Sequence, residues 1–490
     1  MWTSASGPAR GAQRRSTGLT LAAPLTIARE ALAVDQAWLV GGAVRDLAMG
    51  REVADLDLAM AGDVRAAARR LADAVDGPMF RLSEEFGAWR VIAPDRSWHA
   101  DLNPLRGATI EEDLAVRDLT INAMALPLGG GDRVDPFGGA ADLEAGTLRA
   151  VGPSSFTDDA LRVVRVARMA TELGFAPDDA TIALGRASAP AAAEVAQERV
   201  FAELRRILAA ADPVAGVAWM DRLGLVASLL PELHALRGVE QSHYHHLDVY
   251  DHTMAVLEQA ALLRADPAPV FGVARASEIS GVLAEPLADE TDRGVGLMLG
   301  ALLHDVAKPQ TQTDFGGGRI GFPDHDRQGA EASREVLGRL KTSEKMRSHV
   351  AGLARHHLRL GFLVHQRPLD RGDVYRYLRS CGPVAVDVTV LSVADRLATR
   401  GRKADEAIGK HLELARELIG DALVWHADGP PAPLLRGDEL ARELGLPPGP
   451  WLGDLLDRLG EAQYRGDVTT REDAIVWARE SLNPPEPDGG

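Results

Sequence analysis

The sequence predicts an α+β domain near the amino terminus, followed by regions built only of helices. Between residues 37 and 135, short strand-like runs alternate with helical patterns, which is typical of a sheet covered by helices. From residue 157 onward, apolar residues recur at spacings of three and four, the period of an amphipathic helix. We therefore expect a disordered leader at 1–24, an α+β domain at 25–150, an all-α region at 151–235, an all-α domain at 236–405 and a helical tail at 406–490.

The elements of the α+β domain follow from the same patterns. Strands are expected where short apolar or alternating runs lie between turn residues, at 37–40, 56–60, 90–93 and 99–102. Helices are expected where apolar residues return every three or four positions, at 43–49, 64–75 and 121–125.

Composition restricts the class of protein. With 490 residues, of which 46% are hydrophobic, the chain is long enough for several compact domains. Its single cysteine, Cys381, can form no internal disulfide, which fits a reducing, cytoplasmic location. The longest apolar run, at 295–303, is far shorter than the roughly 18 residues that a membrane span needs. We therefore expect no membrane association.

The charge balance excludes further classes. A formal charge of −17 argues against a broad basic surface that holds nucleic acid without recognising its shape. The first lysine of the chain is Lys308, so the residues before it hold no lysine for a P-loop or a Schiff base. Nucleotide chemistry in the first domain must therefore use other residues.

A strand, two glycines and a helix are predicted in succession at 38–46. Gly41 and Gly42 would leave the amide groups of the helix N-terminus open to a triphosphate, and Arg45 would project from the first turn. An ordinary tight connection gives the same pattern, so this signal alone does not identify a site.

Two carboxylates lie on the next predicted strand. Asp55 and Asp57 are spaced i and i+2, so their side chains share one face of the strand. Leu56 and Leu58 take the opposite face, toward the core. Neighbouring carboxylates repel each other unless a cation lies between them, and paired Mg²⁺ ions are the usual solution in phosphoryl transfer. Asp101, on another predicted strand, would complete the cluster; the alternative is an exposed polar strand face.

Six motifs follow one another in order, at 39–46, 55–57, 113–124, 135–143, 157–168 and 197–199. Together they resemble the class II family of tRNA nucleotidyltransferases and bacterial poly(A) polymerases, over about residues 37–235. The resemblance implies a polymerase beta-like nucleotidyltransferase head at 25–150 and a helical, RNA-binding neck at 151–235. The implied catalytic residues are Asp55, Asp57 and Asp101, the first two as Mg²⁺ ligands. The implied nucleotide-binding residues are Gly41, Gly42, Arg45, Arg117, Asp118, Asp159, Arg162, Arg165 and Arg168.

Asp159 and Arg162 offer a way to choose the incoming base. Spaced i and i+3 on a predicted helix, they would project together like the edge of a base. The carboxylate can accept from the exocyclic amine of cytosine or adenine, and the guanidinium can donate to the adjacent ring acceptor. Guanine and uracil carry a carbonyl at that position, which would leave two acceptors facing each other. A surface ion pair is the alternative interpretation.

The connection between Asp101 and Asp113 is short. In CCA-adding members of the family this region holds a flexible loop that is used when the enzyme switches from C to A. Here only residues 102–112 separate the two aspartates, which favours an A-adding enzyme or a poly(A) polymerase over full CCA synthesis.

A second set of candidate residues lies in the helical domain at 236–405. Histidines recur there inside apolar helical patterns, accompanied by two aspartates: His252, His304, Asp305, His325, His356, His357 and Asp395. Imidazoles and carboxylates together suit a divalent transition metal, and an aspartate next to a histidine can bridge two ions. A lone histidine in such a pattern is usually a core residue, whereas this ordered set favours a metal site.

The order of these residues resembles the HD phosphohydrolase superfamily, over about residues 243–400. It implies His252, His304, Asp305 and Asp395 as primary metal ligands. In two-metal members the additional ligands match His325 and one or both of His356 and His357.

Together, the two resemblances imply a template-independent tRNA 3′-end nucleotidyltransferase that adds C and/or A from CTP and ATP by a two-metal mechanism. The HD domain would hydrolyse phosphoesters, as in repair of RNA 3′ ends. The expected partners are the tRNA 3′ end, ATP and CTP; no oligomeric state is predicted. Two alternatives stay open: a poly(A) polymerase, and an HD-type phosphohydrolase whose amino-terminal half binds RNA.

Overall fold

The computed structural model describes residues 23–84, 86–241, 247–317, 319–399, 404–447 and 449–482. The predicted leader at 1–24 lies outside these residues except for its last two positions. The chain forms two compact units: one contains the residues up to 158 together with 176–181, and the other contains 159–175 and the residues from 182 onward. The predicted divisions at 150, 235 and 405 stay predictions.

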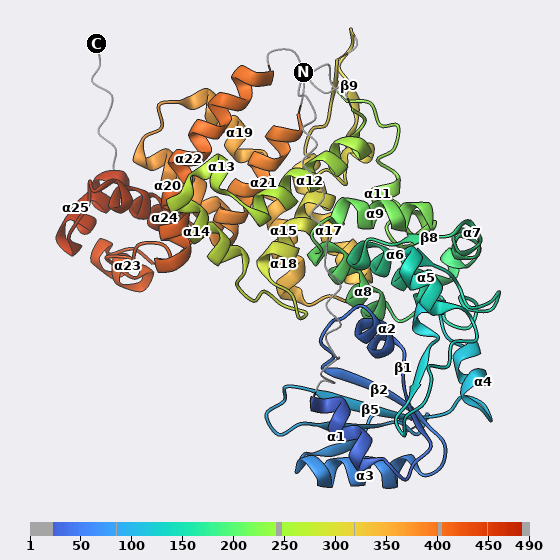
Figure 1. Cartoon of the computed structure of the whole chain (residues 1–490). Helices are drawn as coiled ribbons and strands as arrows, with labels where there is room; N and C mark the ends of the chain where they lie inside the picture. Colours follow the sequence, from blue (N-terminus) through green and yellow to red (C-terminus); the bar gives the residue numbers. More distant parts are fainter. Residues whose placement is uncertain are drawn as a thin grey trace, which may run out of the picture. The chain divides into compact units, whose positions relative to one another are not determined.

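The first unit contains a six-stranded mixed sheet in the order β3-β4-β5-β2-β1-β6 (Figure 1). The central strands β2 and β5 are parallel, and the other neighbouring pairs are antiparallel. The strands are β1 (Ala37–Val40), β2 (Asp55–Met60), β3 (Met79–Arg81), β4 (Trp89–Ile92), β5 (His99–Pro104) and β6 (Ala125–Pro127). A separate two-stranded parallel pair joins β7 (Thr147–Leu148) to β8 (Ala176–Pro177).

Helices α1 (Ala23–Ala31) and α3 (Val64–Val75) cover one face of this sheet (Figure 1). Leu56 and Leu58 of β2 point into that core, as the alternation predicts, and both are almost fully buried. The neighbouring positions of β2 take the other face, where Ala59 packs with residues of α4. The remaining helices of the unit are α2 (Gly42–Ala48), α4 (Ile110–Ala115) and α5 (Gly139–Ala145).

The four predicted strands and the first two predicted helices are confirmed within one or two residues at their ends. The helix predicted at 121–125 is wrong: Thr120–Asn122 form one 3₁₀ turn, and the chain then enters β6. Pairing of β6 with β1 overrides the local helical pattern, and Pro127 ends the strand. Strands β3 and β6 have three residues each, too few for an alternating pattern to show.

The second unit is built mainly of helices, as predicted. Helix α15 is apolar on all sides and every one of its residues is buried, because α12, α18 and α21 pack around it. The helices that matter below are α6 (Leu161–Leu173), α8 (Gln197–Ala209), α12 (Val249–Ala265), α15 (Arg293–Leu303), α17 (His325–Arg339), α18 (Glu344–His356) and α21 (Ala385–Ala398). The others are α9 (Pro213–Arg222), α10 (Leu225–Leu229), α11 (Pro231–His234), α13 (Ala268–Phe271), α14 (Val273–Leu283), α16 (Lys308–Thr311), α19 (Arg359–Leu363), α20 (Arg371–Cys381), α22 (Ala404–Asp428), α23 (Gly437–Leu444), α24 (Pro450–Arg465) and α25 (Arg471–Leu482), and α7 (Asp179–Ser188) crosses the unit boundary.

One small feature departs from the all-α prediction for 236–405. Strands β9 (Thr313–Asp314) and β10 (Ile320–Gly321) form an antiparallel hairpin just before α17. Gly316 and Gly317 adopt positive φ angles in its turn, a conformation that side chains disfavour.

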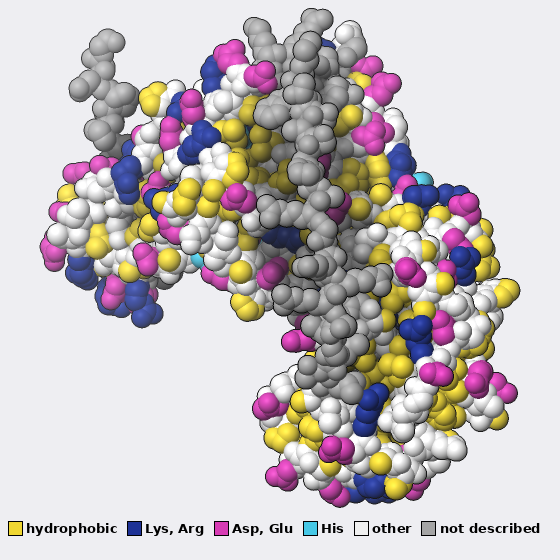
Figure 2. Space-filling model, viewed as in Figure 1, with side chains coloured by type: hydrophobic (Ala, Val, Ile, Leu, Met, Phe, Trp, Pro, Cys, Tyr) yellow, Lys and Arg dark blue, Asp and Glu magenta, His cyan; other side chains and the backbone are white. Residues whose placement is uncertain are grey.

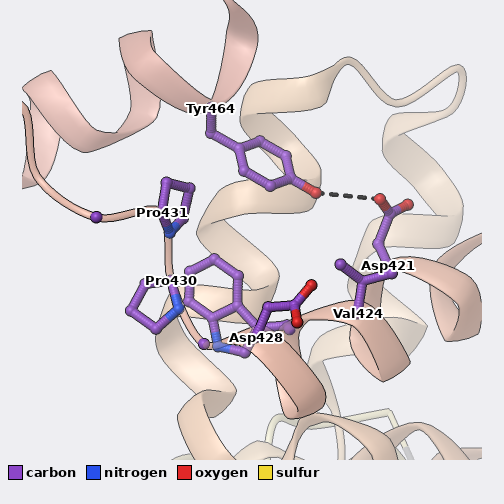
Figure 3. A pocket seen from close by; sticks show the side chains of 9 residues that line it. Asp421, Val424, Asp428, Pro430, Pro431 and Tyr464 are labelled. Atoms are coloured by element: carbon purple, nitrogen blue, oxygen red, sulfur yellow. Dashed lines mark hydrogen bonds between the residues drawn. The ribbon is translucent and has the colours of Figure 1, made fainter.

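Near the carboxy terminus, α22 and α24 enclose a surface pocket of about 340 Å³. Figure 3 shows Tyr464 and Asp421 on facing walls, where the Tyr464 hydroxyl donates a 3.1 Å hydrogen bond to Oδ1 of Asp421. Trp425 and Tyr375 complete an aromatic cluster with Tyr464. This cluster fixes the last helices to the rest of the second unit.

Charged side chains of both signs are interspersed over the face seen in Figure 2, with hydrophobic side chains between them. This mixed surface agrees with the overall charge of −17. Among the described residues, no helix combines the length and apolarity needed to cross a bilayer.

Candidate functional site

The parallel pairing of β2 with β5 brings the predicted carboxylates together. In this register Asp57 is the partner of Asp101, and Asp55 is the partner of His99. Alternation places Asp55, Asp57 and Asp101 on the same face of the sheet, opposite α1 and α3. His99 Nδ1 lies 2.9 Å from Oδ1 of Asp55, whose side chain is largely exposed. The three carboxylates therefore form one cluster at the surface of the first unit.

Gly41 lies against this cluster. Its φ is +69°, and a Cβ atom there would lie 3.1 Å from Nη1 of Arg117 and 3.5 Å from Oδ2 of Asp57. A side chain at this position would therefore strain the backbone and crowd both groups. The glycine loop, the arginine and the aspartate, which are far apart in the sequence, thus surround one small volume.

The electrostatics of Asp57 fit a bound cation. The Asp57 side chain still reaches solvent, but the protein atoms crowded around it desolvate the carboxylate and raise its pKa, and the carboxylates of Asp101 and Asp55 raise the pKa further against the opposing effect of Arg117. The carboxylate form is therefore costly unless positive charge is added. A divalent cation held by Asp55 and Asp57 would supply that charge, so these residues fit the metal that the sequence predicts.

Asp101 has a partner that the sequence analysis missed. Arg90, its antiparallel neighbour on β4, donates from Nε to Oδ1 at 2.6 Å and from Nη2 to Oδ2 at 2.7 Å. Such a two-point ion pair fixes the orientation of the carboxylate. Only the cross-strand register reveals this partnership, because the sequence does not specify which strands become neighbours.

Two further networks orient the candidate phosphate- and ribose-binding residues. Nη1 of Arg45 donates to Oδ1 of Asn122 at 2.9 Å, and Asn122 in turn donates to Oδ1 of Asp118 at 3.0 Å. Arg117 donates from Nε and Nη2 to Oδ2 of the buried Asp113. Asn122 and Asp113 lie in the motif at 113–124, for which the sequence assigned them no role, and they hold the two arginines and Asp118 in place.

The base-selecting candidates belong to the second unit. Asp159 lies just before α6 and not on it, and its Oδ1 accepts a 3.1 Å hydrogen bond from the backbone N–H of Leu161. Its Oδ2 accepts from Nη2 of Arg199 at 2.8 Å. Arg162 lies in the first turn of α6, and its backbone N–H donates to the carbonyl of Asp159. The structure therefore adds Arg199, on α8, to the pair expected from the sequence.

The other two arginines of α6 face α8. Nε of Arg165 lies 3.6 Å from Oε1 of Glu203. Arg168 is buried and forms ion pairs with Glu172 and Glu203. Its guanidinium therefore joins the two helices, and its predicted nucleotide contact remains a prediction.

A second cluster forms inside the second unit, around Asp305. The helix ends of α15 and α18 supply His304 and His357, α17 supplies His325, and α12 and α21 supply His252 and Asp395. Nε2 of His304 lies 3.1 Å from Oδ2 of Asp305, while Nε2 atoms of His325 and His357 lie 3.4 and 3.7 Å from Oδ1. Nε2 of His252 lies 3.0 Å from Oδ1 of Asp395 and 3.9 Å from Oδ2 of Asp305.

The ligand atoms form two overlapping groups among the described residues. One group is His252, His304 and Asp305, the other is Asp305, His325 and His357, and all five residues are buried. Each oxygen of Asp305 thus faces a different set of imidazoles. This arrangement fits two cations that share Asp305 as a bridge.

The orientation of the imidazoles supports a metal site. The Nδ1–H groups of His304, His325 and His357 donate to the carbonyls of Ala301, Phe322 and Ala354, at 2.9, 2.6 and 2.7 Å. Each Nε2 lone pair is therefore left to point inward, which is the usual arrangement behind a metal-ligating histidine. Nε2 of His304, Nε2 of His325 and Oδ1 of Asp305 are buried without a hydrogen-bond partner in the described part of the chain.

The prediction for the paired histidines needs a correction. His357 belongs to the cluster, whereas Nδ1 of His356 accepts a 2.8 Å hydrogen bond from Arg359 and is turned away. His356 is the last residue of α18, and among the described residues its ring contacts Arg359 and is not part of either ligand group. Burial lowers the pKa of His357 to about 4, which keeps the imidazole neutral as a ligand must be. Lys308, whose Nζ lies 2.6 Å from Oδ2 of Asp305, was not anticipated.

Comparison with known proteins identifies the family of this chain. Three family models match consecutive parts of the chain: “Poly A polymerase head domain” at 37–149, “Probable RNA and SrmB- binding site of polymerase A” at 174–237 and “HD domain” at 249–400. The A-adding tRNA nucleotidyltransferase of Deinococcus radiodurans is 36% identical over 90% of this chain and 96% of its own length. The CC-adding tRNA nucleotidyltransferase of Thermus thermophilus is 35% identical over 90% of this chain and 92% of its own.

A solved structure shares the fold. The Thermotoga maritima CCA-adding enzyme, complexed with tRNA, superposes with a TM-score of 0.61 at 19% identity, over 93% of this chain and 95% of that one. The fold predicted from the sequence, a nucleotidyltransferase head followed by helical regions with an HD domain, is confirmed.

Proposed function

Because the chain belongs to the tRNA nucleotidyltransferase family, we propose that it adds C and/or A to the 3′ end of tRNA without a nucleic-acid template. The single observation that carries this proposal is the convergence of Asp57, Asp101, Gly41 and Arg117 at one surface of the first unit. CTP and ATP are the proposed nucleotide substrates, and the tRNA 3′ hydroxyl is the proposed nucleophile.

Each group of the first cluster has a task in this reaction. Asp55 and Asp57 would hold divalent cations, with Mg²⁺ proposed, whose chemistry is to activate the attacking hydroxyl and neutralise charge on the phosphates. Asp101, oriented by Arg90, adds a third carboxylate on the same face. Asp113 holds Nε and Nη2 of Arg117, and Nη1 lies next to Gly41, where the triphosphate would approach the bare backbone.

We assign base selection to Asp159 and Arg162, together with Arg199. The Asp159 carboxylate accepts from the exocyclic amine that cytosine and adenine share, and an arginine donates to the neighbouring ring acceptor. Arg199 holds the carboxylate before a base arrives. The choice between adding C, adding A, or adding both one after the other is a separate property. The relatives include an A-adding and a CC-adding enzyme at nearly equal identity to this chain.

The connection after Asp101 is short and closely held. Helix α4 begins at Ile110, and the turn before it is fixed by hydrogen bonds from the N–H of Arg106 to Asp113 and from the N–H of Ala108 to Glu112. A fixed connection of this length leaves no room for a long mobile loop. This supports an enzyme that performs part of CCA synthesis, or a poly(A) polymerase, and the assay below separates these cases.

We propose a second, hydrolytic activity for the cluster around Asp305. Its residues would hold two divalent transition metals, whose chemistry is to activate water against a phosphoester. Lys308 neutralises part of the charge on Asp305 and places a cation next to the cluster, where a phosphate would lie. A cyclic or terminal phosphate at an RNA 3′ end is the proposed substrate, since its removal exposes the hydroxyl that the first cluster uses.

One assay tests the nucleotidyltransferase activity directly. Purified protein with Mg²⁺ is given each nucleoside triphosphate in turn and tRNA transcripts that end before CCA, at C or at CC. Addition of A only to the CC end identifies an A-adding enzyme, addition of CC alone a CC-adding enzyme, and long A tails a poly(A) polymerase. No incorporation with any transcript would refute the proposal.

We place this activity in the cytoplasm, which suits a chain with one cysteine.

A further inference from the structure

Three ionisable residues lie buried together in the second unit, apart from the metal-binding cluster. They are Arg293 at the start of α15, His349 in α18 and Asp387 in the first turn of α21, and we call them the buried triad. Asp387 is fully buried, and the other two residues are nearly so. Arg293 forms an ion pair with Asp387 and donates to the carbonyl of Pro383 at 2.8 Å. Nε2 of His349 lies 3.5 Å from Oδ1 of Asp387.

The triad occupies the same three helices that supply ligands to the cluster around Asp305. From the triad, α15 leads to His304, α18 leads to His357 and α21 leads to Asp395. Since the three helices converge at the triad and again at the cluster, they run in the same sense between the two. At 1.5 Å per residue, the separations correspond to about 16 Å along α15 and about 12 Å along each of the other helices.

Because the three helices pack closely at the triad, the position of each helix along its axis depends on the triad. Gly296, on α15 next to the triad, gives space to the His349 ring, since a Cβ there would lie 2.9 Å from its Cδ2. Helices are stiff over two or three turns, so a shift of one helix at the triad moves its ligand at the other end by a similar distance. Metal sites tolerate deviations of only a few tenths of an ångström in their ligands.

The energetics do not explain the triad as a source of stability. Burial of an ion pair is costly, and an apolar group of similar size is often neutral or better. Three atoms of the triad also lack a hydrogen-bond partner among the described residues: Nε of Arg293, Nε2 of His349 and Oδ1 of Asp387. A buried ion pair can instead fix the relative position of the helices that carry it.

We propose that the buried triad is a positioning device that sets the helix register of the metal ligands His304, His357 and Asp395. The proposal rests on the metal site of the proposed hydrolytic function. Arg293, His349 and Asp387 touch neither substrate nor metal in this role and act only through the helices that they join.

The test measures metal affinity in the full chain. Every protein carries Asp57→Asn, which removes the metal site of the first unit, and Mn²⁺ binding is followed by titration calorimetry at a temperature where circular dichroism shows complete folding. Asp387→Asn keeps the shape of the side chain and removes its charge. Thr389→Val is the matched control: Thr389 lies on the same helix as Asp387, and its replacement removes a buried hydrogen bond to Tyr377 of α20 without touching the triad.

We expect Asp387→Asn to weaken Mn²⁺ binding by about 10- to 100-fold, as loss of an orienting partner behind a metal ligand does, while Thr389→Val leaves it unchanged. A second variant replaces the triad by apolar residues, Arg293→Met with His349→Leu and Asp387→Leu. It should fold with similar thermal stability but share the weakened Mn²⁺ binding.

Three results would overturn the proposal. If both triad variants fold and bind Mn²⁺ within about twofold of the parent chain, the triad has only a structural role. If Thr389→Val weakens binding as much as Asp387→Asn, general destabilisation of α21 is the cause. If the parent chain itself takes up no Mn²⁺, the proposed hydrolytic function fails and the positioning role fails with it.

Discussion

Asp57 and Asp101 are register partners on the parallel strands β2 and β5, and both carboxylates lie on the sheet face opposite α1 and α3. Two aspartates 44 positions apart in the sequence thus meet where their carboxylates can share a cation.

Replacement of Asp57 by alanine should abolish nucleotide incorporation. Removing a metal-binding carboxylate costs several kcal/mol of transition-state stabilisation, so we expect a loss of about 1000-fold or more in a single-turnover assay. Asp132→Asn, at an exposed position of the same unit, is the control. Hydrolysis of a phosphodiester by the second cluster should remain, and its parallel loss in a folded variant would contradict two independent sites.

The pH dependence of stability should report the raised pKa of Asp57. Because desolvation and the neighbouring carboxylates raise this pKa above the unfolded value, the protonated form is favoured by folding. The stabilising contribution is therefore present at low pH and is lost as the pH rises through the raised pKa. Asp57→Asn, without divalent cations, should melt at a higher temperature than the unmodified chain at neutral pH. The difference should shrink toward about pH 4; an unchanged difference would contradict the assignment.

Asp159 should decide which bases are accepted. Asp159→Ala removes the acceptor for the exocyclic amine, so the preference for CTP and ATP over UTP and GTP should fall by about 10- to 100-fold in competition assays. Asp158→Ala provides a neighbouring control that should keep the preference. A uniform loss of rate with all four nucleotides would assign Asp159 a structural role instead.

The two adjacent histidines should behave differently. His357→Ala removes a proposed ligand and should weaken Mn²⁺ binding to the second cluster by more than about 100-fold. His356→Ala should change it by no more than about twofold, because its ring contacts Arg359 instead. Calorimetry and hydrolysis of a chromogenic phosphodiester both measure this contrast, and equal effects of the two substitutions would refute it.

Cys381 should resist alkylation in the folded protein. Burial raises the pKa of this thiol to about 12, so almost no thiolate is present at neutral pH. We expect iodoacetamide to modify it only after unfolding, as followed by mass spectrometry at several denaturant concentrations. Rapid modification under native conditions would show that the helix around it opens.

Local patterns were enough to predict the strands that carry the carboxylates, the helical character of the second unit and the order of the metal-ligand candidates. Alternation alone placed Leu56 and Leu58 in the core, and it put Asp55 and Asp57 on the other face. These features depend on neighbours within a few residues along the chain.

Features that depend on tertiary pairing could not be predicted in this way. The bidentate contact of Arg90 with Asp101 requires that β4 and β5 become neighbours, and the contact of Asp159 with Arg199 requires that α6 packs on α8. The difference between His356 and His357 depends on where α18 ends, and helix ends are poorly encoded by periodicity.

The short parallel pair β7–β8 limits where this chain can be divided. Ala176–Pro177 return to the first unit to pair with Thr147–Leu148, Asp178 pairs with Arg149, and Thr181 accepts from the N–H of Ala150. A fragment cut at residue 158 would therefore lose a strand and two polar contacts. The segment that completes the first unit follows α6 in the sequence, so recombination could exchange an intact first unit only together with the helix for which we propose a part in base selection.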